Sequence, residues 1–175
     1  MTRLNKSECL EWAFGNLMDN ATRGKVAEFV VAKALDVAKG QRVEWEYADL
    51  HYAELAIEVK SSGYLQTWHQ SAPSRIVFDI APRSEKWDPK TNIVSKLPKP
   101  RRLADAYVFC LFKEQDPIEA DPLDTDQWQF YVASTRKLDE HFGSQKSAAL
   151  STVQPVCEAT SFLGIRAAID SIRHS

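Results

Sequence analysis

The chain has 175 residues, of which 44% are hydrophobic and 26% charged, and it carries 22 Lys and Arg against 24 Asp and Glu. These values are ordinary for one globular domain, and they exclude a disordered, collagen-like or coiled-coil chain. The net charge of −2 excludes a general basic field, so any contact with nucleic acid has to come from a local patch. We expect a single domain over residues 1–175.

Neither a membrane anchor nor an oxidising compartment is expected for this chain. Its longest apolar stretch, around 104–112, is interrupted by Asp105 and is far shorter than the ~20 residues that a membrane helix needs. The amino-terminal residues contain no apolar signal-peptide segment. The three cysteines, Cys9, Cys110 and Cys157, are odd in number and lack C-x-x-C spacing, which is typical of reduced thiols. We expect a cytoplasmic protein without a structural zinc site.

The first forty residues have the pattern of two helices. Ser7 can cap a short amphipathic helix, and Asn20 or Thr22 can cap a second helix over residues 24–38. The second segment is apolar on nearly every side, which is typical of a buried helix. We expect it to stop at Gly40.

The hydrophobic period changes from helix to strand after this segment. Residues 43–48 alternate between apolar and polar, and residues 55–60 do so again. This pattern predicts two half-buried strands that pair as a hairpin around a turn at 50–53. Two further short strands are expected at 64–68 and 75–80.

The second half of the chain predicts a mixed sheet with covering helices. Residues 81–102 contain four prolines and are expected to form a loop. The hydrophobic run at 104–112 is typical of a strand covered on both faces. A strand at 128–133 and helices at 135–142 and 161–173 complete an α/β domain with a mixed sheet.

One expected strand carries a pair of side chains suited to phosphodiester chemistry. Residues two apart in a strand share a face, so Glu58 and Lys60 are expected side by side while Ile57 and Val59 point into the core. The carboxylate can bind a divalent cation, and the lysine can orient or help deprotonate an attacking water. The alternative is an exposed strand face with an ordinary ion pair, and the spacing alone does not decide between the two.

Two more acids are candidates for a metal site, because Mg²⁺ takes oxygen ligands and is usually held by one or two carboxylates. Asp49 follows the first expected strand, so hairpin pairing can bring it close to Glu58. Glu28 lies on an apolar helix face, where an ionised carboxylate is costly unless something compensates it. The alternatives are a turn residue for Asp49 and an ion pair between Glu28 and Lys25.

The order of these residues resembles a known family. Glu28, Asp49 and Glu58-Val59-Lys60, followed by Ser61-Ser62-Gly63, resemble the PD-(D/E)XK nuclease superfamily, the restriction-endonuclease-like fold. The resemblance covers about residues 20–80 by motif and the later elements by pattern only. Ala48 stands where the name-giving pattern has a proline.

This resemblance implies a central mixed β-sheet flanked by helices and a Mg²⁺-dependent endonuclease that hydrolyses DNA, with Mn²⁺ able to substitute. It implies that Asp49 and Glu58 bind the metal, that Lys60 is the catalytic lysine and that Glu28 is a supporting acid. Gln66 has the same strand parity and is a further catalytic candidate, with a solvent-facing glutamine as the alternative. The alternative function is an inactive nuclease-fold module that binds nucleic acid or assembles with partners. The site residues do not distinguish DNA from RNA.

Contacts to nucleic acid are expected mainly from one basic segment. Six of the seven charged residues in 86–102 are cations, and two prolines stiffen its end. A solubilising loop is the alternative. The candidate nucleic-acid-binding residues are Lys96, Lys99, Arg101, Arg102, Trp68 and His69. The apolar helical stripe at 162–172 is expected to close the domain; a homodimer through it is the alternative, because a double-strand cut needs two active sites.

Overall fold

The computed structural model describes residues 3–42, 47–88 and 91–174. Its helices are α1 (Lys6–Phe14), α2 (Asn20–Leu35), α3 (Thr135–Phe142), α4 (Leu150–Val153) and α5 (Ile165–Arg173), with 3-10 turns η1 (Thr125–Gln127) and η2 (Phe162–Gly164). Its strands are β1 (Leu50–Tyr52), β2 (Leu55–Gly63), β3 (Val77–Asp79), β4 (Arg83–Asp88), β5 (Ile93–Arg101), β6 (Ala106–Phe112), β7 (Trp128–Ser134), β8 (Ser147–Ala149) and β9 (Glu158–Thr160).

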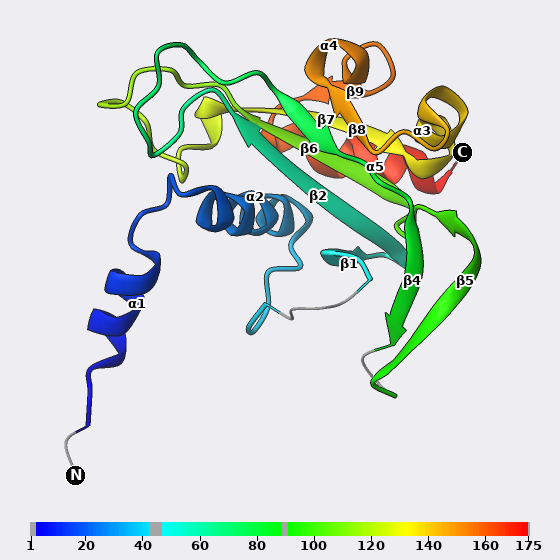
Figure 1. The fold of residues 1–175 in the computed structure, drawn as a ribbon, viewed down its shortest axis with the longest axis horizontal. Coiled ribbons are helices and arrows are strands. Elements are labelled where there is room, and N and C mark those ends of the chain that lie inside the picture. Colours follow the sequence, from blue (N-terminus) through cyan, green and yellow to red (C-terminus); the bar gives the residue numbers. More distant parts are fainter. Residues whose placement is uncertain (1–2, 43–46, 89–90, 175) are drawn as a thin grey trace.

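Five of these strands form one mixed sheet in the order β1-β2-β6-β7-β9 (Figure 1). The central pair, β2 and β6, runs parallel from Ile57 opposite Ala106 to Gly63 opposite Phe112, and the other pairs are antiparallel. Helices α2 and α5 cover one face of the sheet, while α3, α4 and the small β3–β8 sheet cover the other. The expected α/β fold with a mixed sheet flanked by helices is confirmed.

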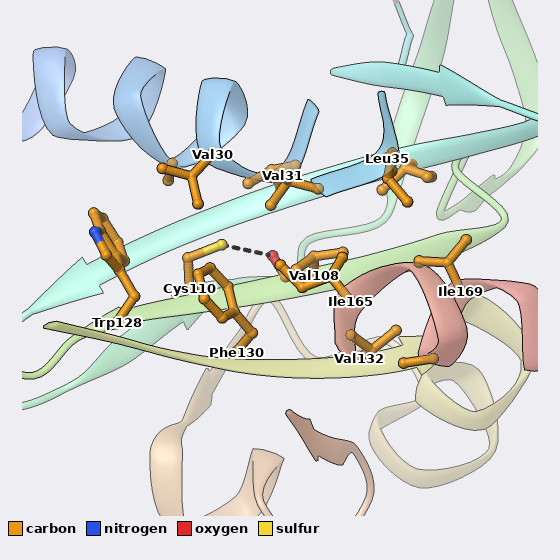
Figure 2. Packing of buried hydrophobic residues seen from close by; sticks show 14 of the residues in the cluster. Val30, Val31, Leu35, Val108, Cys110, Trp128, Phe130, Val132, Ile165 and Ile169 are labelled. Atoms are coloured by element: carbon orange, nitrogen blue, oxygen red, sulfur yellow. Dashed lines mark hydrogen bonds between the residues drawn. The ribbon is translucent and has the colours of Figure 1, made fainter. Parts of the chain in front are cut away.

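Strand β6 supplies side chains to the cores on both faces, because successive side chains of a strand alternate. Every residue of β6 is buried, as the continuous hydrophobic run predicts. Its residues on the α2 side are Ala106, Val108, Cys110 and Phe112, and those on the other side are Tyr107, Phe109 and Leu111. Figure 2 shows the first core, in which Val31 of α2 and Ile165 of α5 pack in one cluster with Val108.

Helix α2 is buried as expected, but both of its predicted ends are wrong. It begins at Asn20, because the side chain of Asp19 caps it and accepts from the backbone N–H of Ala21. It stops before Gly40, because Asp36 adopts a left-handed conformation (φ 61°) and closes the helix. Helix α1 is capped by Asn5 rather than Ser7, and none of its residues is buried.

The hairpin before β2 exists, but its strand and turn differ from the prediction. Residues 43–46 of the expected strand 43–48 lie outside the described residues, and Tyr47 and Ala48 belong to no strand. Residues 50–52, predicted as a turn, form β1 and pair with β2. The turn consists of Ala53 and Glu54, both with positive φ (47° and 72°), the geometry of a two-residue hairpin loop. Neither residue type signals that geometry in a sequence.

The predicted loop at 81–102 is wrong, because β4 and β5 form a two-stranded antiparallel ribbon. Arg83 pairs with Arg101 and Glu85 pairs with Lys96, so residues 97–100 bulge opposite a single residue. Pro98 and Pro100 fall within this irregular stretch. A missing N–H costs no ladder hydrogen bond there, which is how the ribbon tolerates prolines.

The remaining strand and helix predictions divide between confirmed and wrong. The expected strand at 64–68 is wrong, since these residues lie in a loop, whereas 75–80 contains β3. The strand at 128–133 and the helix at 135–142 are confirmed, and the helix expected at 161–173 begins as η2 and continues as α5. The short elements β8, α4 and β9 were not expected. Across the described residues, no helix combines the length and apolar character of a membrane span.

Candidate active site

Strand β2 places Glu58 and Lys60 side by side, as its period predicts. Lys60 Nζ donates to Glu58 Oε1 over 2.6 Å, and the two side chains are 20% and 13% exposed respectively. Ile57 and Val59 alternate with them and are buried in the core beneath α2. The pair is therefore half-buried and does not lie on a fully solvated strand face.

Asp49 is fixed next to this pair by the end of the β1–β2 ladder. The ladder pairs residues only as far as Leu50 opposite Ile57, so the backbone N–H of Val59 lies beyond it. Asp49 Oδ2 accepts from that N–H over 2.7 Å, and Asp49 N donates to Ile57 O over 3.1 Å. On this edge of β2, no described strand residue pairs beyond Ile57. The carboxylate of Asp49 accepts the hydrogen bond of the Val59 N–H, which a longer β1 would otherwise accept.

Glu28 faces the same region from α2, with a partner that the sequence did not suggest. Glu28 Oε1 accepts from Arg42 Nη2 over 2.9 Å, and Arg42 Nε pairs with the other carboxylate oxygen. The Glu28 side chain is only 13% exposed. Glu28 and Asp49 both line a pocket of about 300 Å³ between α2 and His51.

The electrostatics of these acids are coupled. Burial raises the pKa of Asp49, the hydrogen bond from Val59 lowers it, and the nearby Glu28 raises it again. Burial likewise raises the pKa of Glu58, which the ammonium of Lys60 lowers and Asp49 raises. Carboxylates whose pKa values are raised by burial and by a neighbouring acid gain from any cation placed beside them.

Two of these carboxylates suit a hard divalent cation. Asp49 and Glu58 are neighbouring, half-buried oxygen donors, and one or two carboxylates are the usual protein share of a Mg²⁺ site. In the part of the chain that the structure describes, no group of three or more Asp, Glu, His or Cys side chains is arranged to hold a metal by itself. The residues present fit an ion that completes its coordination with water and phosphate.

Gln66 is bound into the loop that follows β2. Its Nε2 donates to Gly63 O over 3.1 Å and to Ser74 Oγ over 3.2 Å, and its backbone N–H donates to Gln70 Oε1. Its Oε1 is buried and has no hydrogen-bond partner among the described residues. These contacts hold the loop together, and none of them joins Gln66 to Lys60.

Trp68 and His69 are both exposed, Trp68 to 58%. They lie in the loop after Gly63, where β2 ends, and a strand carries that end ~16 Å beyond Glu58. Trp68 is therefore not part of either core. Both side chains are accessible. They follow the end of β2 that lies opposite the β1–β2 turn, whereas Asp49 lies nearer the turn.

Arg102 was expected to contact nucleic acid, and the structure contradicts this. The residue is 4% exposed. Its guanidinium donates to Ile80 O, Gly143 O and Gln145 O and pairs with Asp139. Arg102 therefore fastens the base of the ribbon to the loop after α3. Lys96, Lys99 and Arg101 are exposed on the ribbon, where they remain candidates.

Two cations of β4 lie near the site: Arg83, which sequence reasoning missed, and Lys86, which belongs to the expected basic segment 86–102. Lys86 Nζ lies 4.2 Å from the centre of the Tyr47 ring, and that ring meets the His51 ring edge-on at 5.5 Å. Arg83 lies close enough to Glu58 to lower its pKa. In the sequence, only Tyr47, two residues before Asp49, indicated an aromatic residue near the site. The prolines of 81–102 predicted a loop, so the strand that carries Arg83 and Lys86 was not expected.

No model of a protein family, no curated protein and no solved structure matches this chain. The comparisons therefore leave the resemblance to PD-(D/E)XK nucleases as an expectation from the order of Glu28, Asp49, Glu58 and Lys60 in the sequence.

Proposed function

We propose that this chain is a Mg²⁺-dependent endonuclease of the PD-(D/E)XK type, with a restriction-endonuclease-like fold, that hydrolyses DNA phosphodiester bonds. One observation carries the proposal. Asp49, directly before β1, and Glu58 and Lys60 on β2 gather where the ladder between the two strands of the hairpin ends. Two acids and an amine at one point are what metal-assisted attack on a phosphate requires.

Each residue has a separate role in this proposal. Asp49 and Glu58 would hold the ion, which supplies positive charge against the charge that develops on the phosphate. The ammonium of Lys60 donates to a phosphate oxygen or holds the attacking water. The N–H of Val59 keeps the Asp49 carboxylate in place, and Glu28 adds negative charge beside it. Partial burial strengthens all of these interactions, because the local dielectric constant is lower than that of water.

A non-catalytic role is the second candidate, and one observation favours it. Glu58 is paired with Lys60 and Glu28 with Arg42, so cations of the chain itself already balance two of the acids. Such pairs also occur in purely structural clusters. In that case the chain binds nucleic acid or assembles with partners without hydrolysis.

Cleavage assays on site variants test the proposal. Plasmid, linear, branched and single-stranded DNA, with RNA beside them, are incubated with Mg²⁺ or Mn²⁺. We expect wild-type cleavage that chelation abolishes, and a rate reduced by ~10²-fold or more in Glu58→Gln and in Lys60→Met, since each removes a charge from the transition state. The matched controls Glu140→Gln and Lys137→Met change exposed residues of α3 and should cleave like wild type.

Metal binding supplies a readout that is independent of turnover. A ligand that binds only the folded state raises the melting temperature. We expect Mg²⁺ or Mn²⁺ to raise that of the wild type, and expect a smaller or no effect on an Asp49→Asn/Glu58→Gln variant. A metal-independent melting temperature together with no cleavage would reject the nuclease in favour of the non-catalytic role. Wild-type cleavage by both site variants would show that the active site is misassigned.

A further inference from the structure

The β4–β5 ribbon extends away from the central sheet (Figure 1). Its two strands pair only with each other among the described residues, and every residue of β5 except Leu97 is exposed. A lone two-stranded ribbon has marginal stability in water. An exposed arm of this kind is therefore more readily explained by what it binds than by what it contributes to the core.

The ribbon concentrates positive charge in a chain that is slightly acidic overall. Its described residues include five cations and two acids, a balance of +3, whereas the whole chain carries −2. The cations are Arg83, Lys86, Lys96, Lys99 and Arg101, and the acids are Glu85 and Asp88. All five cations except Lys86 are exposed. The surface complements a polyanion.

The base of the ribbon adjoins the acidic site. Arg83, the first residue of β4, lies close enough to Glu58 to lower its pKa. Lys86 packs on the ring of Tyr47, which precedes Asp49 by two residues in the sequence. A backbone of phosphates that follows the ribbon inward would therefore reach the acids.

The shape of the ribbon selects one kind of nucleic acid. Two strands lie ~4.8 Å apart, and the six residues of β4 span ~20 Å. The major groove of B-form DNA is ~12 Å wide and admits such a ribbon, whereas the major groove of A-form RNA is deep and narrow and does not. At the outer part of β5, Ile93 and Val94 are 59% and 57% exposed, apolar groups that can contact thymine methyl groups.

We infer that the β4–β5 ribbon enters the major groove of duplex DNA, with Lys96 and Lys99 on the phosphates. The inference rests on the proposed nuclease function for the reaction. It adds the substrate class, a B-form duplex in place of an RNA duplex or a single strand, and the element that recognises it.

Fluorescence anisotropy with the full chain in a chelating buffer tests this without cleavage. The probes are a labelled DNA duplex of about two helical turns, the RNA duplex of the same sequence and the single DNA strand. We expect the DNA duplex to bind at least ~10-fold more tightly than the RNA duplex. Lys96→Ala/Lys99→Ala should weaken duplex binding by ~10-fold or more and lower the slope of log affinity against log salt by ~2. The control Lys33→Ala/Lys113→Ala removes two exposed lysines elsewhere and should change affinity less than ~2-fold.

Three results would overturn the inference: equal losses in the ribbon and control variants, equal affinity for DNA and RNA duplexes, or no binding of the DNA duplex, which would favour a protein partner for the ribbon. The failure of the proposed function looks different. If the ribbon variants bind and cleave DNA like wild type, the nuclease stands and the ribbon inference falls. If duplex binding depends on the ribbon and no cleavage occurs with any metal, the inference stands and the nuclease falls.

Discussion

Two carboxylates in this chain are held where ionisation is unfavourable. Burial raises the pKa of Asp49 and of Glu58; Glu28 raises the pKa of Asp49 further, and Asp49 raises that of Glu58. At neutral pH both groups ionise at the expense of folding stability, by ~1.4 kcal/mol for each pKa unit. A protein that keeps such acids gives up stability for a local negative charge, which is typical of functional sites.

The pH dependence of Asp49→Asn tests this cost. Because the folded pKa lies above the unfolded one, the native state binds more protons between the two values, and stability falls as pH rises through that interval. The asparagine carries no titrating proton, and its amide oxygen can still accept from Val59. We expect Asp49→Asn to be more stable than wild type at pH 7, with the gain disappearing as the pH falls below the unfolded pKa of ~3.9.

Urea denaturation between pH 3 and pH 8 measures this difference. Glu119→Gln, which likewise replaces a carboxylate by an amide but at an exposed loop position, serves as the control and should leave the pH profile of stability unchanged. A variant less stable than wild type at pH 7 would mean that the Asp49 carboxylate is net stabilising, contrary to the expectation.

Two adjacent arginines at the end of β5 differ in role because their surroundings in the fold differ. Arg101 and Arg102 are identical in type and neighbours in sequence, yet Arg101 is exposed and Arg102 is buried. Arg102 joins the ribbon base to the end of α3 by donating to three backbone carbonyls and pairing with Asp139. No sequence pattern separates the two arginines, since the carbonyls that hold Arg102 come from distant residues.

Removing the buried arginine should therefore be costly. Arg102→Met leaves three carbonyl groups without their donor and is expected to lower the free energy of unfolding by ~3–5 kcal/mol. The matched variant Arg101→Met, one residue away on the exposed side, should stay within ~0.5 kcal/mol of wild type. Urea unfolding followed by circular dichroism gives both values. Similar losses in the two variants would contradict the assignment of Arg102 as a structural residue.

The elements that were predicted well are those whose hydrophobic pattern is complete within one segment of the sequence. The run from Ala106 to Phe112 needs no partner information to be identified as a covered strand, and the alternation around Glu58 and Lys60 identifies their shared face. The ribbon was missed because its prolines signal a loop, and only the pairing register shows that they lie in a bulge. The turn at Ala53 and Glu54 was missed because its positive φ values arise from pairing, without glycine or asparagine.

At the scale of the whole molecule, the central sheet divides the interior into two cores, and α1 belongs to neither. The first core contains α2 and α5, and the second contains α3, α4 and β3. Helix α1 extends away from both, with Trp12 90% exposed (Figure 1). The sequence predicted an amphipathic helix there, but amphipathicity alone does not say whether an apolar face finds a partner within the chain. The first packed residues of the chain are Leu17 and Met18, which contact the first core.

Deletion of the residues up to Gly15 tests how far α1 is independent. One contact that joins α1 to α2 is Lys25 Nζ, 5.1 Å from the centre of the Phe14 ring, an interaction of ~0.5–1 kcal/mol at an exposed site. We expect the shortened chain to unfold in the same single transition, within ~1 kcal/mol of the full chain. Extending the deletion through Met18 removes apolar surface from the core and should lower stability by a further ~2 kcal/mol or more, because each buried apolar side chain contributes ~1.5–3 kcal/mol. A loss of several kcal/mol from the shorter deletion alone would contradict the picture of α1 as a segment outside the core.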